Sequence, residues 1–251
     1  MPDLNVTDLT SGAPLQSTDL IYVGRASGGP PNDFKAAIAD VDVRYPRLFT
    51  AAIDPTIGDD SGDGVKMGDM WRNTARGDVF DCISNTPGAA IWRHRRRRLA
   101  LLLGDTDHTG DTNETKIASA LIPAGVPRTK ALVRITTTWR LTNGADDKTP
   151  RIRYGAADDL TGTVISANVL TTSDLMRHQV DLIFTAAAVQ RAGVGAADPE
   201  GWGASVTFAN LAVDSAAASY LVFSAQLENG ADFCGVRSIE VDLTLPDIAP
   251  P

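Results

Sequence analysis

Cysteine, histidine and aromatic residues are scarce in this chain of 251 residues, which has two cysteines, three histidines and 6% aromatic residues. Cys82 and Cys234 lie far apart and do not form the dense framework of a small disulfide-linked protein. We interpret them as free, buried residues, with a single disulfide between them as the alternative. Together with the scattered histidines they form no metal-binding spacing, so we expect no metal centre and no cofactor.

The chain also lacks a long hydrophobic run. Its longest, Leu99 to Leu103, is far too short to span a bilayer. The first residues, MPDLNVTDLTSG, contain acidic residues and no apolar core of a secretory signal. The sequence therefore predicts a protein that is made in the cytoplasm and is not inserted into a membrane.

An excess of positive charge is absent as well. The net charge is −8 and the pI is about 4.8, which argues against a general role in binding nucleic acid or membrane surfaces. A content of 43% hydrophobic and 22% charged residues suits one or two globular domains.

The most regular pattern in the chain lies between Ala131 and Tyr154. Alternation with a period of two indicates a half-buried β-strand, because successive side chains point to opposite faces of a sheet. Asn143-Gly144 then favours a turn, and the alternation resumes from Thr149 to Tyr154. We predict a β-hairpin here. The residues of its first strand that are expected to face the core are Ala131, Val133, Ile135, Thr137, Trp139 and Leu141.

Strand patterns continue through the rest of the C-terminal half, and helical periodicity is almost absent from it. Together with the hairpin they give about eight strands separated by turns, which is typical of a β-sandwich or jelly roll. We assign residues 104–251 to an antiparallel, jelly-roll-like β-sandwich. The further candidate strands are 116–122, 163–170, 176–186, 205–211, 219–227 and 236–245.

The N-terminal half is different. In residues 1–64, a short strand at Asp19–Val23 is followed by a predicted short helix from Phe34 to Val41, with Asn32 or Asp33 as its N-cap. Residues 65–103 form a small β unit and an arginine-rich junction. Its predicted strands are Met70–Arg72, Asp78–Ile83 and Ile91-Trp92. This unit has few apolar residues, so we expect it to rely on neighbouring chains for burial.

The arginine-rich junction contains one histidine and five arginines. Such a block is typical of phosphate binding, but the chain is acidic and Trp92 is the sole neighbouring aromatic residue. Guanidinium groups also form bidentate pairs with carboxylates, within a chain or between subunits. We favour structural pairing or a solvated linker; nucleic-acid binding and docking on an acidic partner surface are the alternatives. The arginines are Arg93, Arg95, Arg96, Arg97 and Arg98.

Two acidic stretches resemble the start of an EF-hand calcium loop. Both lack the twelfth-position glutamate, since Met70 and Lys116 stand there, and both lack flanking helices. We interpret them as acidic turns, with a calcium ion that clips β elements together as the alternative. The residues at the first, third, fifth and sixth positions are Asp59, Ser61, Asp63 and Gly64, and Asp105, Asp107, Thr109 and Gly110.

Motifs for catalysis are absent: there is no nucleophile elbow, Walker loop or dinucleotide fingerprint, so we predict a protein that is not an enzyme. Candidate ligand contacts are Trp202, which lies between glycines in a predicted loop, and Tyr154. Burial of Trp202 beneath its loop is the alternative. Trp139 falls on the apolar face of its strand and is predicted to be a core residue.

Several passages resemble the fibre and spike proteins of tailed bacteriophages, including the head spikes of gene transfer agents. GDMWRNTARGDVFDCISNTPGAAIW, residues 68–92, is similar to a small β repeat of such fibres. LLLGDTDHTGDTNETKIASALIPAG, RITTTWRLTN and KTPRIRYG are similar to the start of their C-terminal sandwich. DLIYVGRASGGPPNDFKAAIADV is similar to their attachment region.

This resemblance implies a homotrimeric virion protein. Its N-terminal region would attach to other virion proteins, and its C-terminal sandwich would bind host cell-surface glycans as receptor. The resemblance implies no catalytic residue. A decoration protein of the head or tail without receptor binding is the first alternative, and a carbohydrate-active enzyme is the second.

Overall fold

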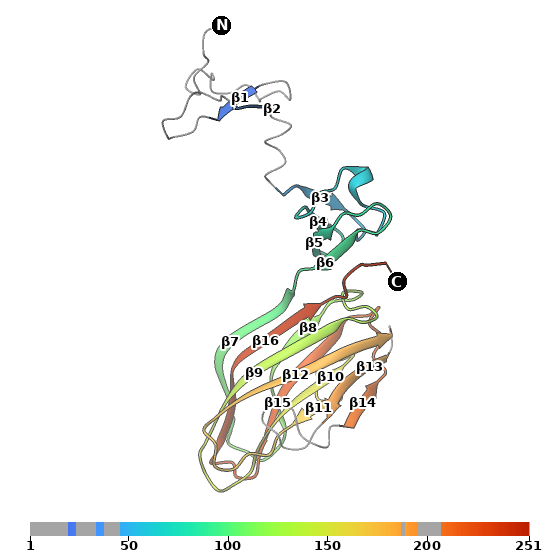
Figure 1. The fold of residues 1–251 in the computed structure, drawn as a ribbon. Coiled ribbons are helices and arrows are strands. Elements are labelled where there is room, and N and C mark those ends of the chain that lie inside the picture. The colour runs from blue at the N-terminus through green and yellow to red at the C-terminus, as the bar shows by residue number, and fades with distance from the viewer. Residues whose placement is uncertain (1–19, 24–33, 38–45, 187–188, 195–206, 251) are drawn as a thin grey trace.

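The computed structural model describes residues 20–23, 34–37, 46–186, 189–194 and 207–250. These residues lie mainly in β-strands that form four sheets (Figure 1), so the predicted fold class, mainly β and antiparallel, is confirmed. In the same residues, the helical element is one 3-10 turn at Ser61–Asp63. No helix of the described part is long and apolar enough to cross a membrane.

Ten strands make up the C-terminal part: β7 (Arg97–Thr109), β8 (Thr115–Ile122), β9 (Leu132–Leu141), β10 (Lys148–Gly155), β11 (Thr163–Ala167), β12 (Leu175–Ala186), β13 (Val189–Val194), β14 (Thr207–Leu211), β15 (Ser219–Leu227) and β16 (Phe233–Thr244). They form a four-stranded sheet in the order β11-β10-β15-β8. The second, six-stranded sheet has the order β14-β13-β12-β9-β16-β7. Every ladder in both sheets is antiparallel.

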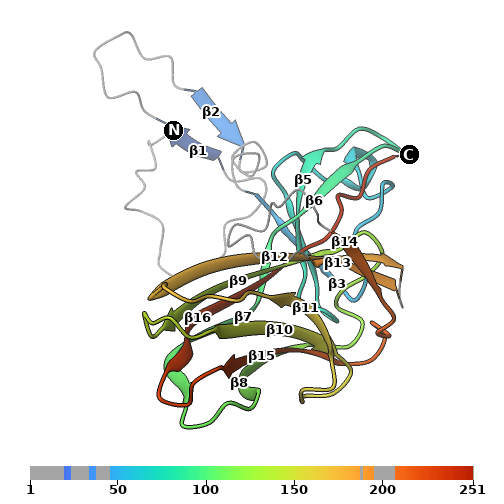
Figure 2. The same cartoon turned by 90° about the horizontal axis from the view of Figure 1, so that it is seen from below.

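The two sheets lie face to face and share one core (Figure 2). Tyr154 of β10 meets Phe184 of β12 edge to face across the core, with 6.3 Å between ring centroids. The faces predicted for β9 are confirmed, because every residue expected to face the core is buried. Thr137 is buried among apolar side chains because its hydroxyl accepts a hydrogen bond from Trp139 Nε1 at 2.9 Å.

The predicted hairpin between β9 and β10 is wrong, although both strands exist. β9 pairs with β12 and β16, whereas β10 pairs with β11 and β15, so residues 142–147 cross from one sheet to the other. A tight hairpin turn needs positive φ at its central residues, and neither Asn143 nor Gly144 has it. The crossing lets the apolar faces of β9 and β10 meet each other in the core.

In the structure the small β unit spans residues 46–94 and is a four-stranded sheet in the order β3-β4-β5-β6, in which β3 and β4 are parallel. The expected boundary between residues 64 and 65 therefore falls inside this unit, because β3 precedes it. The three strands predicted here are confirmed. Phe80, Cys82 and Trp92 of this unit are buried. Its strands are β3 (Leu48–Ala51), β4 (Met70–Asn73), β5 (Val79–Ser84) and β6 (Ile91–His94).

The C-terminal segment of the same chain covers part of this unit. After β16 the chain returns to the small β unit, where Trp92 and Ile248 exchange backbone hydrogen bonds of 2.9 and 2.8 Å. Trp92 is fully buried and Ile248 packs against the core. The same chain therefore covers Trp92, which the sequence pattern could not reveal. Leu48, Ile53 and Met67 of the unit are exposed, so burial by neighbouring chains stays a prediction for them.

The short helix predicted near the N-terminus is also wrong in its first residues. Phe34–Ala37, predicted as the start of a helix, forms β2, which pairs with β1 (Leu20–Val23) in antiparallel register. A helix this short is costly to nucleate, whereas pairing with β1 satisfies the backbone groups directly. The rest of the predicted helix lies outside the described residues.

Four strands were not predicted from the sequence: β2, β3, β7 and β13. β7 contains both the end of the arginine block and the run Leu99 to Leu103. The predicted boundary between residues 103 and 104 therefore falls inside a strand that runs without a break to Thr109. β7 forms one edge of the six-stranded sheet (Figure 1).

Packing between the sheets sets the stability of the sandwich, and Ile135 tests this directly. Ile135 is fully buried in the centre of β9, and its truncation leaves a cavity between the sheets. We expect Ile135→Ala to lower the free energy of unfolding by about 2–5 kcal/mol in urea denaturation. Thr136→Ala, on the opposite face of the same strand, should change it by less than about 1 kcal/mol. Equal effects would contradict the assigned faces.

Candidate functional site: the polar junction between the small β unit and the sandwich

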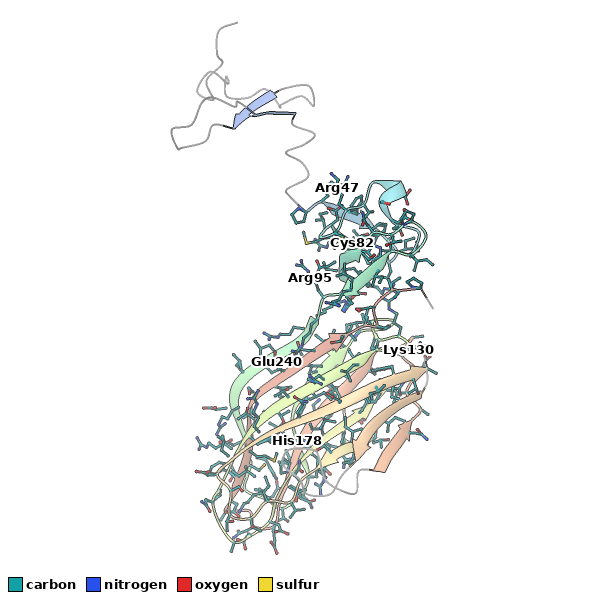
Figure 3. All side chains as sticks on the ribbon, viewed as in Figure 1. Arg47, Cys82, Arg95, Lys130, His178 and Glu240 are labelled. Atoms are coloured by element: carbon teal, nitrogen blue, oxygen red, sulfur yellow. The ribbon has the colours of Figure 1, made fainter. Side chains whose placement is uncertain are left out.

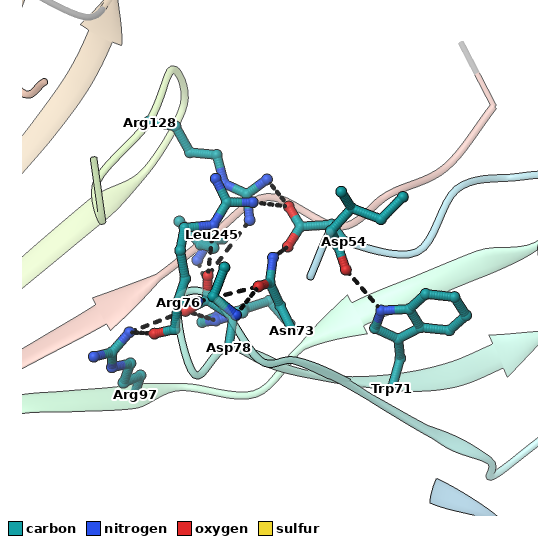
Figure 4. Close-up of polar contacts among 11 residues, drawn as sticks. Asp54, Trp71, Asn73, Arg76, Asp78, Arg97, Arg128 and Leu245 are labelled. Atoms are coloured by element: carbon teal, nitrogen blue, oxygen red, sulfur yellow. Dashed lines mark hydrogen bonds and ion pairs between the residues drawn. The ribbon is translucent and has the colours of Figure 1, made fainter. Parts of the chain in front are cut away.

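A cluster of charged and polar side chains joins the small β unit to the sandwich. It contains two carboxylates, three guanidinium groups and an amide, which come from the small β unit, from the start of β7 and from the loop between β8 and β9 (Figure 4). We call it the junction network. Its members are Asp54, Asn73, Arg76, Asp78, Arg97 and Arg128.

Asp78 lies at the centre of the junction network, immediately before β5. Its side chain is fully buried, and its carboxylate oxygens lie 3.3 Å from Arg97 Nη1, 3.6 Å from Arg76 Nε and 3.8 Å from Arg128 Nη2. A buried carboxylate is tolerated only when charges of opposite sign or hydrogen bonds compensate for the lost hydration. Here the compensating charges come from three separate segments, so burial of Asp78 requires those segments to meet.

Asp54 is the second carboxylate of the junction network. It accepts hydrogen bonds from Asn73 Nδ2 at 2.7 Å and Arg76 Nη2 at 2.8 Å, and it pairs with Arg128. Arg128 belongs to the loop between β8 and β9, so this pair connects the sandwich to the small β unit. The same loop therefore contacts both carboxylates of the network.

The pKa values of both carboxyl groups are lowered, in spite of their burial. Burial works to raise the pKa of Asp78, but His94 and Arg97 outweigh it and hold the pKa below its ordinary value of 3.8. Burial likewise works to raise the pKa of Asp54, and Asn73 and Arg128 hold it below the same value. Both groups are therefore ionised at neutral pH, which the surrounding guanidinium groups require.

His94, at the end of β6, contacts both the junction network and the sandwich. Its Nδ1 accepts a hydrogen bond from the backbone N–H of Leu245, just after β16, at 3.2 Å. Its Nε2 therefore carries the hydrogen and lies 3.6 Å from Asp78 Oδ1. The imidazole is buried at the edge of the ring of Phe80, 5.2 Å away between centroids. This links β6 to the end of the last strand.

The arginine block pairs with carboxylates of its own chain. Arg95 forms a bidentate pair with Asp81 at 2.7 and 2.9 Å, at the lower end of the small β unit in Figure 3. Arg93 lies 3.6 Å from Asp247, and Arg97 belongs to the junction network. On the outer face of the six-stranded sheet, the two remaining pairs are Arg96 with Asp242 and Arg98 with Glu240.

This arrangement is the structural pairing favoured by the sequence, with partners found within the chain. A row of alternating charge continues from it across the sheet. Arg134 lies opposite Asp242 in the ladder and forms a bidentate pair with Asp181 at 2.9 and 3.0 Å. Cross-strand pairs of opposite charge stabilise neighbouring strands. A shallow depression lies over Arg96, Arg98, Glu240 and Asp242.

The two aromatic ligand candidates are placed differently. Tyr154 is fully buried, and its hydroxyl lies 3.1 Å from that of Ser219, so it is a core residue and cannot stack on a ligand at the surface. The alternation of β10 forces this position, because Tyr154 shares the inward face with Ile152. Trp202 lies outside the described residues. Trp139 is buried, as predicted.

The two acidic stretches differ from calcium loops. Asp59 accepts hydrogen bonds from the backbone N–H and hydroxyl of Thr56 at 2.6 and 2.8 Å, which closes a turn. Asp105 and Asp107 lie in β7 and both pair with Arg237 at 3.1 Å. Within the described residues, no group of three or more histidine, cysteine or acidic side chains is arranged to hold a metal ion.

Both cysteines are free and buried, as interpreted from the sequence. Burial raises the pKa of the Cys234 thiol to about 12, so this group is protonated and unreactive at neutral pH.

Asp54, Arg76, Asp78 and Arg128 were not recognised as site residues from the sequence. Each stands in a polar stretch that reads as an ordinary loop or strand end. The one available signal was indirect: an arginine block in a folded chain requires carboxylates, and thirty-one acidic residues were candidates. Nothing in their spacing indicates which of them are buried.

No protein-family model matches this chain, and no curated protein matches it. One solved structure with some similarity is described as "Structure of infectious bursal disease virus Gx strain". It is 9% identical, with a TM-score of 0.24, and the similarity covers 64% of this chain and 42% of that one. The chain thus spans less than half the length of that protein, and similarity at this level establishes neither a family nor a function.

Removal of the central charge tests the junction network. Asp78→Asn keeps the shape of the side chain but leaves Arg76, Arg97 and Arg128 with one compensating carboxylate fewer. We expect it to lower the free energy of unfolding by about 3 kcal/mol, measured by urea denaturation at pH 7. Asp81→Asn, in the half-exposed pair with Arg95, should cost at most about 1 kcal/mol. A cost for Asp78→Asn as small as that would show that the network does not hold the junction.

The stability difference between wild type and Asp78→Asn should depend on pH in a defined direction. Because the folded-state pKa of Asp78 is lowered, its stabilising contribution is present above the unfolded-state pKa and is lost as the pH falls through the folded-state value. We expect the stability difference between wild type and Asp78→Asn to be constant from pH 7 to 5 and to shrink below pH 3.8. A difference that grows on acidification would contradict the assignment.

Proposed function

We propose that this chain is a bacteriophage virion protein, a fibre or spike. It attaches to the particle through the N-terminal region that precedes the small β unit, and it presents the C-terminal sandwich to a glycan on the host cell. In this proposal the chain is not an enzyme, it assembles as a homotrimer, and its partners are copies of itself, other virion proteins and the host glycan. Neither nucleic acid nor a membrane is a partner.

The observation that carries the proposal is the double attachment of the small β unit to the sandwich. The chain enters the sandwich from β6 through Arg95 and Arg96 into β7, and it returns from β16 to pair Ile248 with Trp92. The junction network lies between these two connections. Relative domain motion is the default where an interface is small and polar, but two chain crossings and a buried ionic cluster oppose bending here.

A rigid connection of this kind suits a protein that holds a binding surface away from a particle. The resemblance of residues 68–92, 101–125, 134–143 and 148–155 to fibre sequences supports the same proposal, since these passages include most of the small β unit's strands β4 to β6 and most of β7 to β10. The sandwich also leaves the loops at its two ends for recognition, which is where such folds commonly bind ligands.

Receptor binding is tested with the full-length chain on a glycan array and on host cells. We expect binding to a defined class of glycans, reduced about tenfold by Trp202→Ala through loss of stacking, a change of about 1.4 kcal/mol. Leu175→Ala, at a surface position 62% exposed at the start of β12, is the matched control and should bind like wild type.

Three results would count against this proposal. The absence of binding to any glycan or host cell, with retained binding to the particle, would favour a decoration protein. Turnover of host polysaccharide that is lost on a single aspartate or glutamate substitution would identify an enzyme. Equal binding by Trp202→Ala and wild type would remove Trp202 from the glycan site.

A further inference from the structure

A lysine is completely buried in the sandwich, at the end of the core away from the junction network. Lys148 begins β10 and is 0% exposed, and it lies on the same inward face as Ile152 and Tyr154. Lysine is almost never fully buried without a partner, because the ammonium group then loses its hydration. The surroundings of this amine must therefore compensate for its burial.

The carboxylate that faces Lys148 belongs to Asp232, which immediately precedes β16. Lys148 Nζ lies 3.6 Å from Asp232 Oδ2 and donates a hydrogen bond to Gly144 O at 3.2 Å. The side chain of Asp232 is 11% exposed, and its Oδ2 accepts no hydrogen bond from the described residues. The pair is thus almost completely removed from water, and the carboxylate oxygen that faces the amine is left without a hydrogen bond.

Hydrogen bonds between two neighbouring loops hold this pair in position. The loop before Lys148 and the loop before β16 lie side by side. Asp147 and Glu228 exchange hydrogen bonds of 2.9 and 2.8 Å, and the side-chain amide of Asn229 donates to the carboxylate of Asp146 at 2.8 Å. Groups that are held together in this way react with effective molarities of up to about 10⁵–10⁸ M. The two side chains therefore have little freedom left to lose by reacting.

The burial of this pair also favours a reaction over a stable ion pair. Attraction between two buried charges must offset the loss of hydration of both, which requires further hydrogen bonds that Asp232 Oδ2 lacks. Transfer of one proton from Nζ to Oδ2 removes both charges. It leaves a neutral amine, which is the nucleophilic form of lysine, beside a carboxylic acid.

We propose that Lys148 and Asp232 join in an isopeptide bond that links the two sheets of the sandwich. Nζ attacks Cγ of Asp232, a nitrogen–carbon bond forms, and the bond from Cγ to Oδ2 breaks. Oδ2 leaves as water with two of the three amine protons, and the third proton stays on the amide nitrogen. Nothing is oxidised or reduced. The product is uncharged, and its N–H keeps Gly144 O as a hydrogen-bond acceptor.

The bond closes the end of the sandwich that lies away from the small β unit (Figure 1). β16 begins beside Asp232 and ends just before Leu245, which contacts His94 at the junction. The junction network therefore secures one end of the sandwich by charge, and the isopeptide bond secures the other end covalently. This inference goes beyond the proposed function and does not rest on it.

Mass spectrometry of the full-length chain tests this inference. Folded protein is kept at neutral pH until its mass no longer changes, and it is then denatured and digested. We expect wild type to be lighter than its sequence by one water molecule, with a branched peptide that joins Lys148 to Asp232. A mass equal to that of the sequence shows an ordinary ion pair and overturns the inference. Loss of water without the branched peptide also overturns it, because an aspartate can lose water by cyclising onto its own backbone.

A variant and an internal control separate this reaction from other modifications. Lys148→Arg keeps the positive charge but places an unreactive guanidinium there, so it should keep its full sequence mass. In the wild-type digest, Lys116 and Asp158 are the control, since they lie closer, at 2.7 Å, but are 33% and 42% exposed. We expect no link between them, because water keeps both groups ionised. A link at both pairs, or loss of water from Lys148→Arg, contradicts the inference, and the wild-type digest decides if that variant does not fold.

Discussion

The structure depends on the meeting of two apolar sheet faces. Each long strand of the sandwich turns one face inward, and the inward residues of β9 and β16 lie over those of β10 and β15 in one core. Because the side chains of a strand alternate, a shift of one residue in any ladder would expose that face to water. This constraint fixes the register of the central strands and positions everything attached to their ends.

The junction network lies at the ends of the sandwich strands. Arg97 begins β7, Leu245 follows β16, and Arg128 lies between β8 and β9, so the packing of the sandwich delivers three groups to one place. The small β unit supplies Asp54 and Asp78 to meet them. These buried carboxylates are stable only because Arg97 and Arg128 compensate their charge. The ionic cluster therefore depends on the folded sandwich, and it also connects the sandwich to the small β unit.

The positions of the strands were easier to predict from the sequence than the pairing between strands. Alternation in β9 indicated which residues are buried, because a mainly apolar face must leave water. It could not indicate that β9 and β10 belong to different sheets, since both pairings bury the same side chains. The turn at Asn143-Gly144 favoured the hairpin locally, and the gain from stacking the two sheets outweighed that local preference.

The sequence by itself determined the β class, the strand faces and the arginine block's need for carboxylates, because these follow from local periodicity and charge. The tertiary structure decided the crossing at residues 142–147, the return of Ile248 to Trp92, and the burial of Tyr154 and Lys148. Each of these depends on which distant segments lie side by side. That choice is made by the total apolar area buried and by the compensation of buried charge, and neither quantity exists until the chain has folded.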